Sequence, residues 1–399
     1  MSSPILLTGA SEIVTESSIL TNHAIALEGD RIAAVDTEQS LVDQFPNAER
    51  FDCARHVLTA GFVDSHTHAV FGGFRAAEYE MRARGLDYME IARRGGGINA
   101  SVQSVRALSE SDLVELAIPR LADALHTGTT TIEIKSGYGL TLEDELKMLR
   151  AIARLREHTP IEIVATFLGA HDVPLEMRER RNDYVSLVAN EMVPAVAHEK
   201  LATFCDVFME PGAFIAAESR RILEAGVEHG LIPKLHADEF ANSCAAELAA
   251  EMHAASADHL GAISEAGIAA LSQSKTVATL LPATLFFLGK KTYAPARRLL
   301  DAGVVVALAT DFNPGTAPSS SMPLVLTMAC SQMQMTPFEA LRAATWGGAR
   351  ALLLDDVGRL APGACADVVA WNVASHLEIP YHFGKPPVAA VWKAGKRVI

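Results

Sequence analysis

The chain has 399 residues, of which 49% are hydrophobic and 21% charged, a composition typical of a globular protein with a sizeable core. Its formal net charge of -14 argues against a surface for nucleic acid or for an anionic membrane. Five cysteines without a C-x-x-C pair favour free thiols in a reducing compartment. No signal peptide or bilayer-spanning stretch is visible, so we expect a cytoplasmic protein.

Both ends of the chain predict short strands separated by turns, without long helical patterns. The expected strands are 5–7, 23–27 and 31–35 near the start, and 368–371 with a hairpin over 388–399 near the end.

The middle of the chain alternates apolar runs with amphipathic stretches. Near-continuous apolar strands separated by helices predict a parallel sheet covered on both faces. The expected strands are 60–66, 130–135, 161–168, 206–210, 233–238, 257–260, 276–281 and 304–310. The expected helices include 111–126, 142–156, 185–198, 216–228, 244–253 and 322–333.

This periodicity alone fits an open doubly wound sheet as well as an eight-stranded barrel. The polar residues decide between them, because they follow the ends of the apolar runs, and barrel chemistry gathers at the C-terminal ends of strands. An open sheet leaves its first and last strands apart, whereas a barrel brings His66 next to Asp311. We therefore expect an α/β fold of the (β/α)8 TIM-barrel class.

His66 and His68 end the first apolar run of the barrel, in Asp-Ser-His-Thr-His. Side chains alternate along a strand, so both imidazoles point the same way and can bind one metal ion. Taken alone, an H-x-H pair is as often two ordinary polar histidines, but the other strand ends favour a metal. Imidazole suits zinc and ferrous iron.

Two later strand ends supply further ligands. His236 opens the segment His-Ala-Asp-Glu, where Asp238 could equally be a turn residue at the start of a helix. Asp311 follows an apolar run, and a carboxylate there needs a metal, or a proton shared with the attacking water, to offset its desolvation. Glu239 lies one loop step beyond His236, within reach of such a water or of a substrate N–H. Three histidines and one carboxylate leave room for water, as catalytic zinc sites do.

Four other features carry weaker hypotheses. His259 would orient the nucleophilic water or stabilise an oxyanion, unless it is a satisfied core histidine. His171 would face the substrate. Arg75 follows a Gly-rich loop beside the site and could hold a carboxylate through two hydrogen bonds, although most arginines are solvated surface groups. Residues 95–97, three glycines, fit a lid or an ordinary loop.

At this point the sequence resembles a family. H-x-H, a later strand-end histidine and a final aspartate resemble the amidohydrolase superfamily. More narrowly, four segments look like the imidazolonepropionase family: Glu-Ile-Lys-Ser-Gly-Tyr-Gly-Leu (133–140), Phe-Leu-Gly-Ala-His (167–171), His-Ala-Asp-Glu-Phe (236–240) and Ala-Thr-Asp-Phe-Asn-Pro-Gly-Thr (309–316). The resemblance covers nearly the whole chain.

The resemblance implies hydrolysis of the cyclic amide of 4-imidazolone-5-propanoate to N-formimidoyl-L-glutamate in histidine degradation, by a metal-activated water. It also implies a small β-sandwich domain formed by residues 1–58 and 357–399, with the catalytic barrel over 59–356, and a homodimer. One zinc or iron per chain would bind His66, His68, His236 and Asp311. The residues that would contact substrate or product are Arg75, Tyr138, His171, Glu239, Asn313, Gly315 and Thr316. Glu239, His259 and Asp311 would share the catalytic roles of proton transfer and oxyanion stabilisation.

Three rivals stay open at this stage. His-Ala-Asp-Glu has the H-A-x-E form of mononuclear deaminases that act on nucleobase-like rings. A cyclic-amide hydrolase with two metals would need a bridging carbamylated lysine, for which Lys135 is the only strand-end candidate. A barrel that binds metal without turnover is the third rival, although a closed structural site seldom recruits arginine and tyrosine around an open face.

Overall fold

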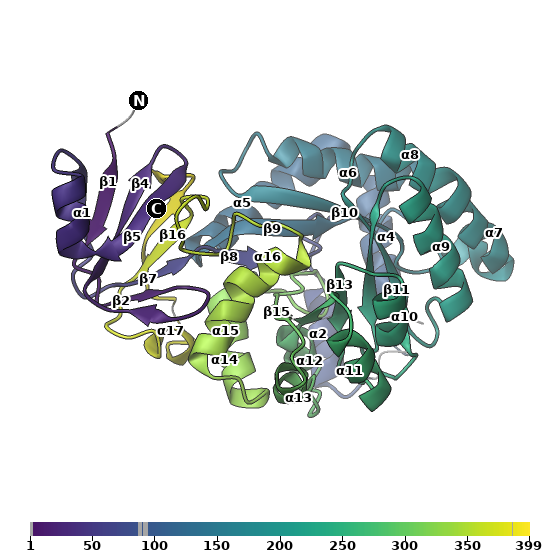
Figure 1. The fold of residues 1–399 in the computed structure, drawn as a ribbon. Helices are drawn as coiled ribbons and strands as arrows, with labels where there is room; N and C mark the ends of the chain where they lie inside the picture. The colour runs from purple at the N-terminus through teal and green to yellow at the C-terminus, as the bar shows by residue number, and fades with distance from the viewer. Residues whose placement is uncertain (1–2, 87–89, 91–94, 385) are drawn as a thin grey trace.

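A parallel sheet of eight strands forms the centre of the computed structural model, which describes residues 3–86, 90, 95–384 and 386–399. The strands lie in chain order, each paired with the next in parallel, as the sequence predicts for a barrel (Figure 1). They are β8 (Phe62–Asp64), β9 (Thr129–Lys135), β10 (Glu162–Ala170), β11 (Phe204–Met209), β12 (Ile232–Ala237), β13 (Ser256–His259), β14 (Val277–Leu280) and β15 (Val306–Leu308).

The first and last strands meet just beyond their C-terminal ends. Thr67 and Phe312 form a parallel bridge, and the amide of Asp311 donates to the carbonyl of His66 at 3.0 Å. The buried carboxylate of Asp64 accepts hydrogen bonds from the backbone amide of Thr310 at 3.0 Å and from its hydroxyl at 2.6 Å. These contacts connect β8 to the end of β15, so the barrel closes where the sequence predicts its chemistry.

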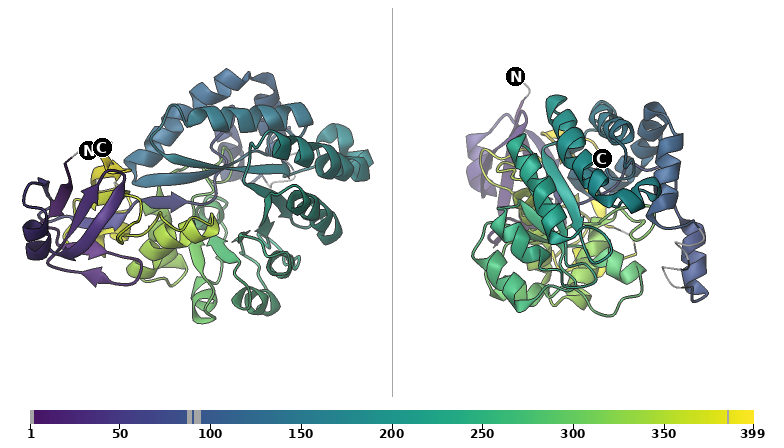
Figure 2. Two further views of the ribbon diagram at one scale, coloured as in Figure 1. Left: turned by 45° about the horizontal axis from the view of Figure 1, so that its top comes forward. Right: turned by 90° about the vertical axis from the view of Figure 1, so that its right-hand side faces the viewer.

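Helices cover the outside of the barrel, and Figure 2 shows them around the sheet from two further sides. All six expected helices are present, the third as a continuous helical segment over 181–198. The helical elements of the barrel region are α2 (Ala76–Ala83), α4 (Ile98–Ala107), α5 (Glu110–His126), α6 (Leu142–Leu155), η1 (Leu175–Arg180), α7 (Arg181–Leu187), η2 (Val188–Met192), α8 (Val193–His198), α9 (Ala216–Glu228), α10 (Ala245–Glu251), α11 (Glu265–Ser272), α12 (Pro282–Phe287), α13 (Ala296–Asp301), α14 (Met322–Gln332), α15 (Pro337–Arg342), η3 (Ala343–Gly347) and α16 (Gly348–Ala351).

Two smaller sheets lie at one side of the barrel, the first built from strands near the start of the chain and the second from strands of both chain ends (Figure 1). One has the order β5-β4-β1-β6 and the other β18-β17-β16-β7-β2-β3. Their strands are β1 (Ile5–Thr8), β2 (Glu12–Val14), β3 (Ile19–Leu20), β4 (His23–Glu28), β5 (Arg31–Thr37), β6 (Glu49–Asp52), β7 (Val57–Ala60), β16 (Val368–Trp371), β17 (Val388–Lys393) and β18 (Lys396–Arg397). Two short helices, α1 (Glu38–Gln44) and α17 (Glu378–Tyr381), accompany them.

The two small sheets share one apolar core. Leu7 and Ile25 of the first sheet pack in the same buried cluster as Leu58, Val368 and Trp392 of the second. This arrangement is the β-sandwich expected from both chain ends. The expected domain boundary at residue 58 falls within β7, which pairs with β16 before the chain enters the barrel, and the division at 58 and 357 stays a proposal.

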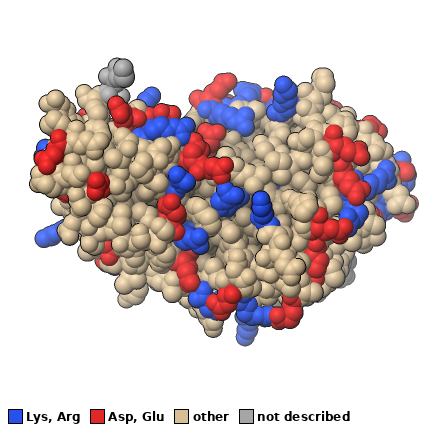
Figure 3. All heavy atoms as spheres, viewed as in Figure 1, with Lys and Arg blue, Asp and Glu red and all other residues tan. Residues whose placement is uncertain are grey.

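Basic and acidic side chains are interspersed over the face drawn in Figure 3, so that face has no large patch of one charge. Within the described ranges, no helix combines the length and the apolar character that crossing a membrane requires.

Two adjacent glycines seat a helix against the barrel. A Cβ at Gly347 would overlap the carbonyl oxygen of Val306 on β15, and one at Gly348 would overlap the carbonyl oxygen of Val63 on β8. The helical segment formed by η3 and α16 therefore touches both closing strands at a distance that only glycine allows.

We expect Gly348→Ala to lower the free energy of unfolding by about 1–3 kcal/mol, because overpacking moves a helix away from the barrel. Thermal denaturation with the matched variant Gly384→Ala is the measurement, since a Cβ at Gly384 would meet nothing within 4 Å. Equal melting temperatures for both variants would show that α16 can shift without cost.

Candidate active site

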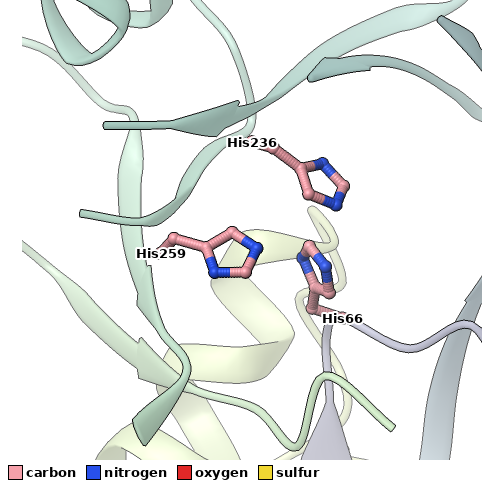
Figure 4. A group of neighbouring side chains, drawn as sticks. All are labelled: His66, His236 and His259. Carbon is pink, nitrogen blue, oxygen red and sulfur yellow. The ribbon is translucent and has the colours of Figure 1, made fainter. Parts of the chain in front are cut away.

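The histidines predicted from separate strands meet at the C-terminal end of the barrel. Nε2 of His66 and Nε2 of His68 each lie 3.5 Å from Oδ1 of Asp311. The ring of His236 lies 4.5 Å from that of His66, centroid to centroid, and His259 lies 5.2 Å from His236. Figure 4 shows His66, His236 and His259 converging from three different strand ends. All four predicted metal ligands therefore belong to one cluster.

The donor atoms of this cluster fit a metal ion. Nε2 of His66 and of His259, Nδ1 of His68 and both ring nitrogens of His236 are buried and have no hydrogen-bond partner among the described residues. Buried polar atoms are normally paired, so unpartnered nitrogens on these neighbouring rings fit a missing ligand. Three overlapping groups hold their donor atoms within 4.8 Å of one another: His66 with His68 and Asp311, His66 with His236 and His259, and His68 with His171 and His236.

Carboxylates contact the other edge of two of these rings. Nδ1 of His66 lies 2.6 Å from Oδ2 of Asp258 in a hydrogen bond. Nδ1 of His236 lies 3.0 Å from Oδ2 of Asp206, without the alignment of a hydrogen bond, while the amide of His236 donates to Oδ1 of the same carboxylate at 3.2 Å. Each of these two rings thus contacts a carboxylate at its Nδ1 edge, which restrains the orientation of the ring.

Asp311 is held by the hydroxyl of Thr284, which donates to Oδ2 and leaves Oδ1 facing His66 and His68. Its backbone has a φ of 53°, a left-handed conformation that is uncommon for aspartate and frequent at functional sites. Burial raises the pKa of Asp311 to about 6, although the hydrogen bond from Thr284 favours the charged form.

Glu239 and His259 form a second pair at the cluster. Oε1 of Glu239 lies 3.6 Å from Nδ1 of His259, and both side chains are buried. Burial raises the pKa of Glu239 well above its ordinary value, and the charges of Asp311 and Glu210 raise it further. A raised pKa favours the protonated form of the carboxyl group, which is the form that can donate a proton.

Tyr138 and His171 border the cluster on the side of His68. The His171 ring stacks on that of His68 at 5.0 Å and 14°, and Nδ1 of His171 lies 3.0 Å from the carbonyl oxygen of Gly137. Burial lowers the pKa of His171 to about 3, so this ring is neutral at pH 7. The Tyr138 ring lies 5.3 Å from His171.

Arg75 packs directly on the loop after β15, because a Cβ at Gly315 would overlap its guanidinium. Nη1 of Arg75 donates to Ser101 at 3.1 Å and Nε lies 3.3 Å from Glu78, with the side chain 10% exposed. The structure thus brings together two predicted substrate-contact segments that are far apart in the sequence.

The Asn313 side chain organises its own loop in this structure. Its Oδ1 accepts hydrogen bonds from the amides of Gly315 at 2.9 Å and Thr316 at 2.7 Å, and its Nδ2 donates to the carbonyl of Asp311 at 2.7 Å. Contact between Asn313 and a substrate stays a prediction, whereas its effect on the shape of the loop is visible.

Asp238 and Glu210 have structural roles near the site. Asp238 accepts hydrogen bonds from the amides of Ser243, Ala245 and Ala246, which confirms its interpretation as a turn residue before a helix. Glu210 accepts hydrogen bonds from the amides of residues 239–241 and so holds the loop that carries Glu239. The glycines at 95–97 precede α4, and whether they form a lid stays open.

Lys135 lies among carboxylates below the histidines. Its Nζ is 2.7 Å from Glu133 and 2.8 Å from Asp206, and the side chain is fully buried. Burial alone lowers the pKa of Lys135, but the charges of Asp206, Glu133 and Asp258 outweigh this and raise it above the ordinary value. Because carbamylation requires a neutral amine, this environment disfavours a bridging carbamate.

Several residues of the site escaped the sequence reasoning. Asp206, Lys234, Asp258 and Thr284 lie on or beside barrel strands and touch a predicted ligand or one of the carboxylates behind it. A usable signal was present, since charged residues stand two positions apart inside apolar runs, as in Lys234 with His236, and alternate positions share one face of a strand.

The pattern that defines the amidohydrolase family matches residues 57–398. The imidazolonepropionase of Myxococcus xanthus is 48% identical over 374 residues, covering 93% of this chain and 89% of that protein. The imidazolonepropionase of Symbiobacterium thermophilum is 44% identical, covering 99% and 97%, and that of Geobacillus kaustophilus is 46% identical, covering 97% and 92%.

Solved structures share the fold at lower identity. A zinc-bound adenosine deaminase from Xanthomonas campestris aligns with a TM-score of 0.74 at 20% identity, covering 98% of this chain and 92% of that one. An ochratoxinase from A. niger aligns with a TM-score of 0.73 at 19% identity, covering 99% and 95%. At these identities the likeness establishes the architecture only.

Proposed function

The chain belongs to the amidohydrolase family, and on that premise we propose that it hydrolyses 4-imidazolone-5-propanoate to N-formimidoyl-L-glutamate. The reaction opens a cyclic amide at a carbon–nitrogen bond and is a step of histidine degradation. One observation carries the assignment: relatives 44–48% identical over nearly the whole chain are imidazolonepropionases.

The family is metal-dependent, and the His-rich cluster supplies suitable donors. We propose that His66, His68, His236 and Asp311 hold one divalent ion per chain, zinc or iron. A bound ion would activate water as a nucleophile at neutral pH. The unpartnered Nε2 atoms of His66 and His236 support two of these ligands, and the position of His68 Nε2, 3.5 Å from Oδ1 of Asp311, supports the third histidine.

The other residues would bind the substrate and move protons. Arg75 would hold the propanoate carboxylate, since a guanidinium forms two parallel hydrogen bonds with such a group. Tyr138 and His171 would border the ring on one side, and the loop with Asn313, Gly315 and Thr316 would border the carboxylate. The raised pKa of Glu239 suits a proton carrier to the leaving ring nitrogen, and His259 would stabilise the developing oxyanion.

Product analysis with freshly prepared imidazolone propanoate tests the proposal. We expect N-formimidoylglutamate to accumulate without release of ammonia. Ammonia from a nucleobase-like ring, with no ring opening of the imidazolone, would instead identify a deaminase. We further propose a cytoplasmic homodimer, for which light scattering of the purified protein gives the mass.

We expect elemental analysis of the wild type to find one metal per chain, and His68→Ala to lose both the metal and activity, because one ligand of four is removed. His158→Ala, a change at an exposed residue, is the control and should keep both. An active, metal-free His68→Ala protein would rule out a metallohydrolase.

We expect Arg75→Ala to lower kcat/KM by about tenfold to a hundredfold while the melting temperature changes little, since a charge-assisted hydrogen bond contributes about 1.5–3 kcal/mol. The measurement is steady-state kinetics, with Arg84→Ala as the control. Arg84 is exposed and follows helix α2, which Arg75 precedes. Unchanged kinetics in Arg75→Ala would place the carboxylate elsewhere.

We expect Glu239→Gln to keep its metal and to lose roughly 10²–10⁴-fold in kcat, because glutamine keeps the shape but cannot carry a proton. Metal content and kcat must be measured on the same preparation. Near-normal turnover would show that Glu239 only contacts the substrate and that Asp311 and His259 transfer the proton. Loss of the metal would show that Glu239 is itself a metal ligand.

A further inference from the structure

Five charged side chains occupy the interior of the barrel directly below the histidines. They are Glu133, Lys135, Asp206, Lys234 and Asp258, and each is 0% exposed. Burying ions is costly, and apolar replacements of buried ion pairs are often neutral or stabilising. A contribution to stability therefore explains this cluster poorly. Its position beneath the predicted metal ligands suggests instead that it acts on those ligands.

The cluster connects to the site through two aspartates. Asp258 accepts a hydrogen bond from Nδ1 of His66 at 2.6 Å, and Asp206 lies 3.0 Å from Nδ1 of His236 while also accepting its amide. With Nδ1 turned toward a carboxylate, Nε2 of each ring is left facing the other histidines, and both Nε2 atoms are unpartnered.

Lys135 joins the two aspartates. Its Nζ is 2.8 Å from Oδ2 of Asp206 and 3.7 Å from Oδ2 of Asp258, so one cation faces the carboxylate behind each ring. Lys234 lies at almost the same distance from Asp258, 3.8 Å, and its Nζ donates to the carbonyl of Ser65 at 3.0 Å and to Glu133 at 3.3 Å. The close contact with Asp206 is therefore what distinguishes Lys135 from Lys234.

We propose that Asp206 and Asp258 are positioning residues that orient His236 and His66 toward the metal, and that Lys135 holds the Asp206 carboxylate in place. A carboxylate behind a ligand histidine fixes the tautomer and the ring and makes the donor nitrogen more basic. The inference rests on the proposed metal site and assigns the buried ion cluster to metal affinity.

The test is the affinity of the apoprotein for Zn²⁺, measured by competition with a chromophoric chelator, and the visible spectrum of the Co²⁺-loaded protein. Asp258→Leu and Asp206→Leu should each bind Zn²⁺ about 10–100-fold more weakly than the wild type, with altered cobalt bands. Asp258→Asn should recover part of the affinity, because an amide oxygen still accepts from Nδ1.

Lys135→Met should weaken Zn²⁺ binding by a similar factor, and Lys234→Met is its matched control. Both variants remove one buried ammonium at a similar distance from Asp258, so a general loss of stability affects both, but of the two lysines only Lys135 contacts Asp206 closely. Circular dichroism confirms that each variant is folded before titration. Equal losses of affinity in the two lysine variants would overturn the role of Lys135.

Two further outcomes separate this inference from the proposed site. A wild type that binds Zn²⁺ while Asp206→Leu and Asp258→Leu keep full affinity and unchanged cobalt bands would refute the positioning role alone. A wild type that binds no ion, or a His68→Ala variant that binds as tightly as the wild type, would refute the ligand set on which the inference depends.

Discussion

Asp64 and Thr310 join the two ends of the barrel, and the geometry of the site follows from that contact. Burial raises the pKa of the Asp64 carboxyl to about 7, and both donors of Thr310 offset this by favouring its charged form. His66 lies two residues after Asp64, and Asp311 one residue after Thr310. The distance between a ligand of the first strand and a ligand of the last strand is thereby set by hydrogen bonds of the backbone and of one buried carboxylate.

The layer below the histidines extends this constraint around the barrel. The interior of such barrels is usually filled by branched apolar side chains. Here β9, β11, β12 and β13 instead contribute charged groups whose ion pairs link four strands. The barrel thus has apolar packing between its sheet and its helices and a polar interior at its functional end, and the two regions serve different purposes.

The eight strands were predictable because each is an apolar run with its own local signal, and β9, β12 and β14 match their predicted ranges within one residue at each end. The amphipathic helices were predictable for the same reason. Several short helices were not, and α12 shows why: its residues lie in a uniformly apolar stretch around Pro282, which has no helical period.

The ligands could also be predicted from the sequence, since a polar residue after an apolar strand is a local pattern. The residues that contact those ligands from behind could not be predicted in this way. Asp258 was not predicted to belong to the site, and Lys135 was considered as a carbamylated ligand, whereas the structure surrounds it with carboxylates. Those pairings join strands far apart in the chain, and nothing in the sequence near Asp258 indicates that its partner is His66.

The separation of 246 positions between Asp64 and Thr310 also determines when the site can form. At a synthesis rate of about 5–20 residues per second, the segment with Thr310 leaves the ribosome roughly 12 to 50 seconds after the segment with Asp64. During that interval the nascent chain carries a histidine pair without its carboxylate ligand, and binding sites of this kind seldom exist before folding. On the proposed ligand set, maturation with metal is therefore a late event that must follow synthesis of most of the chain.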